Sequence, residues 1–412
     1  MRLFLSLIKN KKAGYCINNH LNNILAHKRL IRITTVPMAL RYLLPGQMKF
    51  MQQNGFEVIM ISANGPELKD VIENEQCRHI IVPMTRKITP LQDLKCLLQL
   101  IKIFKKEKPD IVHTHTPKAG LLGMLAAKFC GVKVSIHTVA GMPLMVEKGF
   151  KLQLLKRIEK LTYWAAGNVW PNSTSLYNYI IENKFTAASK LKIIANGSTN
   201  GINIDRFNKE VLDPKMLDDI KNSISYSPQC IYLLCIGRLV ADKGIVELVN
   251  VFLSLQKTHT ALKLIVVGDY EEELDPLPEA IKQQIQNNSN IIHINWTQQV
   301  EYYMHIANCM VFASHREGFP NVLLQAAAMQ LPIICSRITG NVDVVTDKQT
   351  GLIFETANEQ QMKAQVEYAI SNPAEMQQMA ISLQQIIKKD YRRENIWQNM
   401  LSAYKSLLHL KN

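Results

Sequence analysis

The chain has 412 residues, of which 47% are hydrophobic and 20% charged, and this composition excludes an intrinsically disordered protein. Its length suits two domains of roughly 200 residues each better than a single core. The eight cysteines are scattered without a Cys-x-x-Cys pair, which excludes a disulfide scaffold and gives no sign of a zinc or redox site. We therefore expect reduced cysteines in a cytoplasmic protein.

The apolar runs are too short for a membrane-spanning or secretory segment. No uninterrupted apolar stretch reaches about 18 residues. The apolar run at residues 3–8 is shorter than the core of a signal peptide, and no convincing cleavage site follows it.

The net charge of +14 is divided unevenly along the chain. Residues 1–200 contain 29 Lys and Arg against 11 Asp and Glu, whereas residues 201–412 contain 19 against 23. This segregation predicts that the first half meets an anionic membrane surface or an anionic ligand. The alternative is ordinary solubility charge.

The first half predicts strands alternating with helices after a basic segment. Residues 1–30 fit no periodic pattern, and we expect them to form a basic appendage outside the core. Segments of helical length, such as 91–106 and 151–166, separate short apolar runs. The expected strands are 31–36, 57–63, 78–84, 110–116, 132–139 and 168–173. Uniformly apolar strands predict a parallel sheet covered on both faces.

The second half repeats the pattern after a linker at residues 196–205, where Gly, Asn and Ser interrupt both periods. The expected strands are 230–239, 262–269, 290–296, 309–315 and 331–337, followed by two helices within 358–387 and a helix at about 392–410. We predict an α/β protein with doubly wound domains at 31–200 and 201–391 that face a cleft. Segment 392–412 should pack back towards the first domain, because its Trp397 needs a partner.

Two motifs place charges at the carboxyl ends of strands. In GRLVADKG (237–244), Arg238 and Lys243 flank a strand-to-helix turn, where both can reach one diphosphate. The alternative is a surface turn with two solvated charges. In HREGFPNVLLQAAAM (315–329), Glu317 precedes a helix that begins near Pro320, and Gln325 lies about two turns along it. We expect residues 340–343 to form another loop on the same rim.

The order of these motifs resembles glycosyltransferase family 4, the retaining nucleotide-sugar transferases of the GT-B fold. The resemblance runs from Ile31 to the C-terminus and depends on GRL…KG, VGD, REGFPNVLLQA and TGLIF (350–354) at family-like spacings. In the first half, HTHTPKAGLLGMLAAK (113–128) and IHTVAGMP (136–143) are similar to bacterial capsule, O-antigen and exopolysaccharide transferases. The resemblance implies transfer of a hexose or N-acetylhexosamine, commonly from a UDP-linked donor, to a saccharide on undecaprenyl diphosphate.

The resemblance also implies roles for individual residues. Arg238 and Lys243 would hold the donor diphosphate and stabilise the departing nucleotide, and Glu317 would touch the transferred sugar. Backbone amides around Gly318, Phe319 and Pro320 would line the sugar and phosphate pocket, and Asn321 and Gln325 would complete the donor site. The family usually has a glutamate where this chain has Gln325. The Gln325 amide could still form hydrogen bonds with the ribose hydroxyls, but these would not be charge-assisted.

Histidines in the first half are further candidates. Relatives often carry a histidine beside Gly141 that approaches the donor sugar, but this chain has Ala140 there. His137 is the candidate for that catalytic role, with a purely structural histidine as the alternative. His113 and His115 alternate on one strand and should face the same side. Together with Lys118 they are candidates for contact with the acceptor.

No metal motif accompanies these residues. The family resemblance implies that the fixed cations Arg238 and Lys243 replace a metal, so no cofactor is required, although a divalent ion could stimulate the reaction. We interpret the acidic residues 271–275 as a solvated loop. The basic helical segments 102–108 and 148–160 are expected to lie on the inner face of the plasma membrane, with solvated helix faces as the alternative.

Three functions other than glycosyl transfer can be compared with these motifs. No aromatic-rich basic motif or zinc-finger spacing indicates nucleic-acid binding. A GT-B nucleotide-sugar epimerase would keep the fold, but the pairing of GRL…KG with EGFPN argues against it. A scaffold that binds nucleotide sugars without turnover stays open, because of Gln325 and the missing histidine at Ala140.

Overall fold

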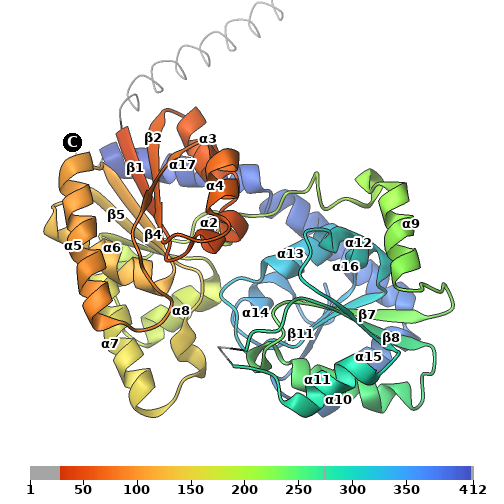
Figure 1. Ribbon diagram of the computed structural model, residues 1–412. Coiled ribbons are helices and arrows are strands. Elements are labelled where there is room, and N and C mark those ends of the chain that lie inside the picture. Colours follow the sequence, from red (N-terminus) through yellow and green to blue (C-terminus); the bar gives the residue numbers. More distant parts are fainter. Residues whose placement is uncertain (1–27, 273–274, 410–412) are drawn as a thin grey trace, which may run out of the picture.

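The computed structural model describes residues 28–272 and 275–409, which form two lobes side by side (Figure 1). The expected basic appendage lies outside the described residues up to residue 27. Its last three residues belong to the first strand, which begins at Lys28. The reason is burial, since Leu30 is fully buried and stands opposite Val58 and Ile111 of the neighbouring strands.

The first lobe is built on a six-stranded parallel sheet in the order β3-β2-β1-β4-β5-β6. Its strands are β1 (Lys28–Ile33), β2 (Phe56–Ser62), β3 (Arg78–Ile81), β4 (Ile111–His115), β5 (Val134–Val139) and β6 (Asn168–Pro171). Its α-helices are α2 (Pro37–Leu43), α3 (Gln47–Gln53), α4 (Leu68–Glu75), α5 (Pro90–Glu107), α6 (Pro117–Phe129), α7 (Gly149–Ala165) and α8 (Thr174–Glu182). Short 3₁₀ turns follow at η1 (Pro143–Val146) and η2 (Ala188–Lys190).

Both faces of this sheet are buried, which explains the uniformly apolar strands. Neighbouring residues of β1 enter different clusters: Leu30 packs with α3, α4 and the C-terminal helix, whereas Ile31 packs with α5 to α8. Strands with two covered faces need apolar residues at successive positions rather than at alternate ones.

The second lobe repeats the arrangement with the order β12-β11-β10-β7-β8-β9. Its strands are β7 (Ile231–Ile236), β8 (Leu262–Val267), β9 (Ile291–Ile294), β10 (Cys309–Phe312), β11 (Ile333–Ser336) and β12 (Leu352–Phe354). Its helices are η3 (Lys209–Val211), α9 (Pro214–Ser223), η4 (Ala241–Lys243), α10 (Ile245–Gln256), α11 (Glu279–Asn287), α12 (Val300–Ile306), α13 (Asn321–Ala328), α14 (Asn341–Val344), α15 (Glu359–Ser371) and α16 (Pro373–Asp390). Strand β12 was not predicted, because its three residues are too few to show a period.

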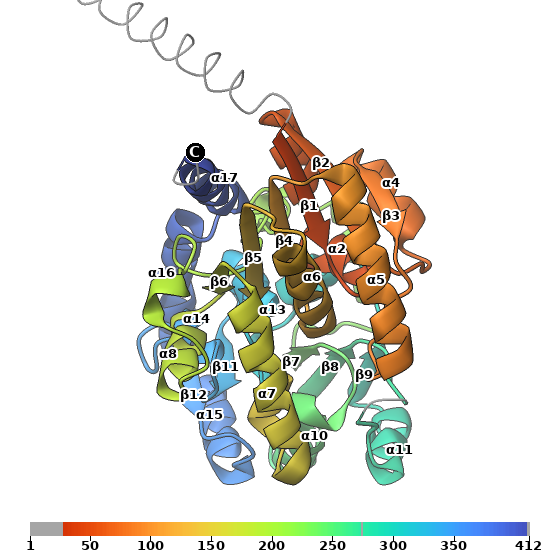
Figure 2. The same cartoon turned by 90° about the vertical axis from the view of Figure 1, so that its left-hand side faces the viewer.

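The two lobes are joined by two chain segments that run next to each other. The first crossing passes through Ile202 and the second through Arg392, and the backbones are bonded there: Ile202 N–H donates to Tyr391 O at 2.8 Å and Arg393 N–H donates to Ile202 O at 3.0 Å. The chain then ends in α17 (Arg393–His409), which lies against the first lobe (Figures 1 and 2).

Trp397 of α17 finds its packing partner in the first lobe. Its ring lies 5.3 Å from that of Phe50, and its Nε1–H donates to Asn200 Oδ1 at 2.6 Å. Gly46 is a glycine for this reason, since a Cβ there would lie 2.8 Å from the Trp397 ring and its φ is +80°. The last helix is therefore a structural part of the first lobe.

Each sheet has the strand order of a doubly wound nucleotide-binding fold, so the predicted α/β class with two such domains is confirmed. In both sheets the order reverses between two central strands, β1 and β4 or β7 and β10. Ligands bind such sheets beyond the carboxyl ends of the strands at this point. Within the described chain, no helix combines the length and hydrophobicity needed to cross a bilayer.

Candidate active site

The switch point of the second sheet brings together the predicted charged residues. Arg238 follows β7, and Lys243 ends η4 just before α10. Glu317 lies between β10 and α13, and its carboxylate forms an ion pair with Lys243 Nζ. Ser314 Oγ also donates to Glu317 Oε1 at 3.2 Å. The two motifs, far apart in the sequence, thus meet at one point, with both charges mostly shielded from solvent (17% and 19% exposed).

Tight backbone packing holds Lys243 in this position. Gly244 has a φ of +67°, and a Cβ there would lie 2.7 Å from Ala313 Cβ. Only glycine allows the start of α10 to approach the end of β10 so closely. Asp242, next to Lys243, pairs with Arg316 at 2.6 Å, which fixes the loop that carries Glu317.

The same loop contacts the first lobe across the cleft. A Cβ at Gly318 would lie 2.5 Å from Gly141 N and closer still to the Ala140 carbonyl, so the lack of a side chain lets the two lobes meet here. Asp343 Oδ1 of the second lobe also accepts from Ser175 N–H at 3.1 Å. Glu317 and Lys243 therefore lie beside a point where the two lobes touch.

The predicted donor-binding residues divide between the cleft and the core. Asn321 and Gln325 of α13 line an interlobe groove of about 440 Å³, together with Tyr42 of the first lobe and Trp296 after β9. The rings of Tyr42 and Trp296 lie 5.3 Å apart across the groove. By contrast, the Phe319 side chain is buried and packs on Tyr391 at 5.4 Å, beside the crossing between lobes. Pro320 is also buried and immediately precedes α13.

His137 lies inside the first lobe rather than in the cleft. It is 3% exposed, its Nδ1 lies 2.9 Å from Thr114 Oγ1, and its ring packs against Gly120 of α6. Burial lowers the pKa of His137 to about 4. This location argues against the predicted contact with the donor sugar and fits the structural alternative. The sequence could not separate the two, because both faces of β5 are buried.

His113 and His115 face the same side of β4, with their rings stacked at 4.4 Å, but that side is covered by α17. His113 Nδ1 lies 2.5 Å from Tyr404 Oη, and His115 Nε2 lies 2.7 Å from the buried Arg32. Burial, reinforced by Arg32, lowers the pKa of both imidazoles well below its usual value. The predicted acceptor role is corrected to a buried polar network that docks the C-terminal helix.

Lys118 also has a structural task in place of the predicted acceptor contact. Its Nζ forms an ion pair with Asp93 at 2.7 Å and donates to Thr85 Oγ1 and Thr89 Oγ1 at 3.1 and 3.2 Å. These bonds tie the loop between β3 and α5 to the start of α6.

Two members of the predicted acidic loop, Glu271 and Asp275, make specific bonds to residues of the rim. Glu271 forms an ion pair with Arg238, and Asp275 Oδ2 accepts from Asp242 N–H at 2.6 Å. Glu273 lies outside the described residues. The sequence analysis did not predict the ion pair between Glu271 and Arg238. The available signal was that VGD (267–269) ends strand β8, which pairs with β7, so residues that follow the two strands lie at the same edge of the sheet.

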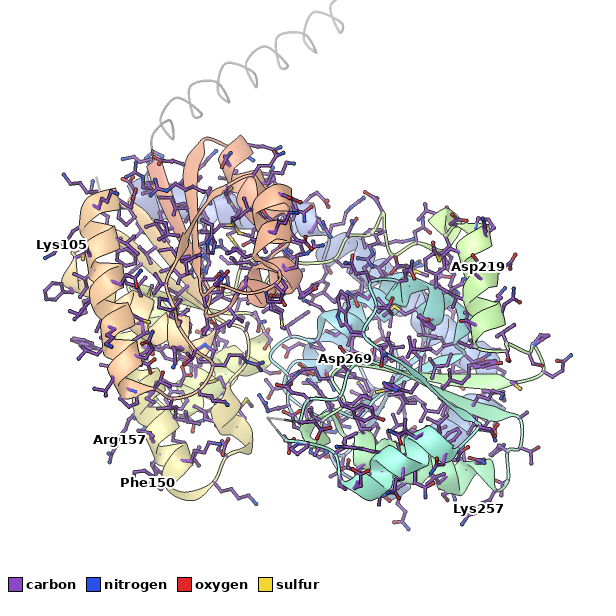
Figure 3. The ribbon with its side chains drawn as sticks, in the orientation of Figure 1. Lys105, Phe150, Arg157, Asp219, Lys257 and Asp269 are labelled. Atoms are coloured by element: carbon purple, nitrogen blue, oxygen red, sulfur yellow. The ribbon has the colours of Figure 1, made fainter. Side chains whose placement is uncertain are left out.

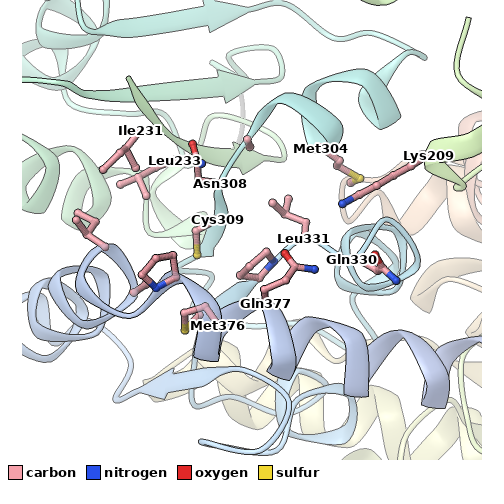
Figure 4. Close-up of a pocket in the computed structure, with 15 residues that line it drawn as sticks. Lys209, Ile231, Leu233, Met304, Asn308, Cys309, Gln330, Leu331, Met376 and Gln377 are labelled. Carbon is pink, nitrogen blue, oxygen red and sulfur yellow. The ribbon is translucent and has the colours of Figure 1, made fainter. Parts of the chain in front are cut away.

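Two further observations concern ligands. Among the residues that the structure describes, no group of three or more His, Cys, Asp and Glu side chains gathers as metal ligands would. A separate cavity of about 360 Å³ lies near the amino ends of β7, β10 and β11, lined by Lys209, Met304, Cys309 and Met376 among others (Figure 4). It is at the opposite end of the sheet from Lys243 and Glu317.

Comparison with known proteins agrees with the geometry. Residues 33–173 match the family described as "Glycosyl transferase 4-like", and residues 218–385 match "Glycosyl transferases group 1". The chain is 31% identical over 382 residues to the capsular polysaccharide biosynthesis glycosyltransferase CapM of Staphylococcus aureus, covering 93% of this chain and 98% of that protein. It is 26% identical to the UDP-Gal:alpha-D-GlcNAc-diphosphoundecaprenol alpha-1,3-galactosyltransferase of Escherichia coli, over 75% and 79% of the two chains.

Solved structures show the same fold. A glycosyltransferase from Rickettsia africae ESF-5 superposes with a TM-score of 0.76 at 20% identity, covering 93% of this chain and 99% of that one. HepE of Anabaena, in complex with UDP-glucose, superposes with a TM-score of 0.77 at 16% identity, covering 92% and 100%. The matched residues, the paired charges at the switch point and the likeness to CapM lead to one conclusion: the chain belongs to glycosyltransferase family 4 and is a glycosyltransferase of the GT-B fold.

Proposed function

We propose that this enzyme transfers a hexose or N-acetylhexosamine, with retention of configuration, from a UDP-linked donor to a saccharide on undecaprenyl diphosphate. The observation that carries the donor side is the Lys243–Glu317 ion pair at the start of α13. In this proposal Lys243 binds phosphate and Glu317 binds the transferred sugar, and the ion pair between them supports a site that holds both parts of the donor. UDP in the Anabaena neighbour and the undecaprenol acceptor of the Escherichia coli relative support the choice of substrates.

The chemistry follows from the charges. As the bond between sugar and diphosphate breaks, negative charge grows on the leaving group. Arg238, Lys243 and the N–H groups at the start of α13 stabilise that charge. A cation fixed by a neighbouring ion pair does this without reorganisation, so we propose that no metal is required. Treatment with EDTA should leave the rate of transfer unchanged, and loss of activity restored by Mg²⁺ would contradict this point.

The test is transfer of radiolabelled sugar from UDP-sugars to lipid-linked acceptor by purified protein. Lys243→Ala should lower kcat by a factor of about 10² or more, because a donor to the developing charge is lost. Thermal unfolding must show that the variant is folded. A folded Lys243→Ala enzyme with unaltered kcat would refute the assignment. UDP binding without turnover of any sugar would instead favour a scaffold that has lost catalysis.

We also propose that the enzyme works on the anionic inner face of the plasma membrane through the outer surface of α5, α6 and α7. These helices lie next to one another on one side of the first lobe (Figure 2). Large apolar side chains are exposed on this surface instead of packing into a core. They are Leu91 (81% exposed), Phe129 (69%), Phe150 (84%) and Trp164 (58%). Figure 3 shows Phe150, Arg157 and Lys105 on this outer side.

The positive charge of this surface favours an anionic bilayer as its partner. Its exposed cations include Lys95, Lys102, Lys105, Lys106, Lys128, Lys151, Arg157 and Lys160. The carboxylates of α5 and α7 are turned away: Asp93 pairs with Lys118, and Glu107 and Glu159 are buried. Two lysines lie over exposed rings, Lys105 over Phe129 at 5.5 Å and Lys128 over Trp164 at 4.4 Å. Such mixed basic and apolar helices bind the interface of anionic membranes.

Sedimentation with vesicles tests the surface. The protein should bind vesicles rich in phosphatidylglycerol and not those of phosphatidylcholine, and Phe150→Ser with Trp164→Ser should weaken binding by about tenfold or more. Val211→Ser is the matched control, since Val211 is 59% exposed on the second lobe. Equal binding by the double variant and the control would refute the proposal.

A further inference from the structure

One carboxylate is shared by two arginines from opposite lobes. Glu271 forms an ion pair with Arg238 of the second lobe, and its other oxygen lies 3.5 Å from Arg86 Nη1 of the first lobe. Both guanidinium groups are about half exposed (43% and 49%), whereas Glu271 is 20% exposed. Glu271 is therefore held between the two lobes by a cation from each.

Arg86 is held in place by its loop. The loop between β3 and α5 is tied down by Lys118, which bonds to Thr85, Thr89 and Asp93. Thr85 Oγ1 and Thr89 Oγ1 are also 3.0 Å apart. A basic side chain is thus presented to the other lobe from a braced loop, and the bracing explains why Lys118 forms its ion pair with Asp93 within its own domain.

The charges at this point do not balance. Two guanidinium groups share the single negative charge of Glu271, and Arg238 is the cation that the proposed function assigns to the donor diphosphate. A diphosphate offers more charge and more acceptor oxygens than a carboxylate, and arginine binds phosphate in a bidentate manner. A diphosphate entering the cleft would therefore compete with Glu271 for both arginines.

Resting on that proposed function, we infer that Arg86 is the first lobe's contribution to a diphosphate site, and that Glu271 occupies the place of the anion until substrate arrives. The same chemistry belongs to two substrates, the nucleotide diphosphate of the donor and the lipid diphosphate of the acceptor. In either case the exchange joins the lobes through the substrate in place of Glu271.

Two substitutions test the inference in the full-length enzyme. Arg86→Gln should weaken binding of the diphosphate by about tenfold, because a charge-assisted hydrogen bond is lost, and Arg86→Lys should retain part of it. Glu271→Gln should have the opposite effect and tighten binding by several-fold, since it removes the competing charge. Glu272→Gln is the matched control, because Glu272 pairs with Lys282 at 2.6 Å instead of with an arginine of the cleft.

Calorimetry with UDP and UMP, and KM for the lipid-linked acceptor, separate the two sources. A donor site predicts that Arg86→Gln weakens UDP binding but not UMP binding. An acceptor site predicts unchanged UDP binding and a raised KM for the acceptor. If Arg86→Gln leaves all three values unchanged, or if Glu271→Gln behaves like Glu272→Gln, the inference is overturned. The outcome with Lys243→Ala is independent, so an inactive Lys243→Ala beside a normal Arg86→Gln would refute this inference alone.

Discussion

Replacement of Gly318 by alanine, which adds a single methyl group, should strongly lower the rate of catalysis. The residue lies one position after Glu317, where the second lobe touches the backbone of Ala140 and Gly141 in the first. Its backbone is not in the left-handed region, so alanine brings no strain of its own. Any effect of Gly318→Ala must come from the space that its methyl group needs between the lobes.

The size of that effect follows from the distances. The new Cβ would lie 2.5 Å from Gly141 N, whereas an ordinary contact begins near 3.4 Å. Backbone atoms cannot turn aside as a side chain can, and the Ala140 carbonyl lies closer still, so the lobes must separate by more than about 1 Å at this point. Misplacement by about 1 Å is enough to lower a rate by about 10²-fold. We expect kcat to fall by about that factor. UDP binding should change much less, because Arg238 and Lys243 both lie on the second lobe and keep their positions relative to each other.

The assay is the transfer rate at saturating donor, measured together with thermal unfolding and UDP affinity. Gly131→Ala is the control: Gly131 has a φ of +64° with open space around it, so alanine there costs about 1 kcal/mol of backbone strain without touching the cleft. It should lower the melting temperature slightly and leave kcat intact. Wild-type kcat in Gly318→Ala would refute the reasoning that lobe closure at this contact is required.

Three further outcomes are expected. Gln325→Glu should tighten UDP binding about fivefold by calorimetry, because a carboxylate makes stronger hydrogen bonds to a diol than an amide does, and weaker binding would contradict this role. Burial raises the pKa of Glu159 to about 7 from 4.5. The folded protein therefore loses stability as pH rises from about 4.5 to about 7, because the carboxyl ionises more readily in the unfolded chain. Glu159→Gln should therefore stabilise the fold by up to about 3 kcal/mol at pH 8 and hardly at all at pH 4.5, and a gain in melting temperature that does not depend on pH would count against the buried charge. Trp397→Ala should destabilise the protein by about 3–5 kcal/mol in denaturant unfolding, since it removes the contact with Phe50 and the bond to Asn200, whereas a loss below about 1 kcal/mol would mean that α17 is not anchored there.

Local patterns were enough to predict the fold and the meeting of Lys243 with Glu317. Every strand but β12 was predicted from runs of apolar residues, because a strand buried on both faces carries its signal within a few positions. Lys243 and Glu317 could be placed together for a related reason. Parallel strands end at one edge of a sheet, so residues that follow two central strands must lie near each other.

The histidines show where that reasoning stops. His113, His115 and His137 are on strands with two buried faces, and nothing local says whether a face turns to the cleft or to a packed helix. Here α17 comes from the far end of the chain to cover His113 and His115, and Gly120 of α6 packs against His137. The sequence indicated a final helix in need of a partner, but only the tertiary structure decided which residues it buries.

Contacts between the lobes, like the burial of these histidines, could not be predicted from local sequence patterns. The sequence by itself determined two doubly wound domains, a basic first half and the cations and carboxylate at the rim of the second. The touching of Gly318 and Ala140, and the sharing of Glu271 by Arg86 and Arg238, depend on how the two domains are oriented. Orientation is set by the paired crossings at Ile202 and Arg392 and by the docking of α17. These contacts join residues far apart in the chain, by 195 positions in the bond Tyr391–Asn196 and by 372 positions in the bond Arg32–Tyr404. Short-range periodicity carries no information about contacts of that range, because it reports only which face of an element is buried.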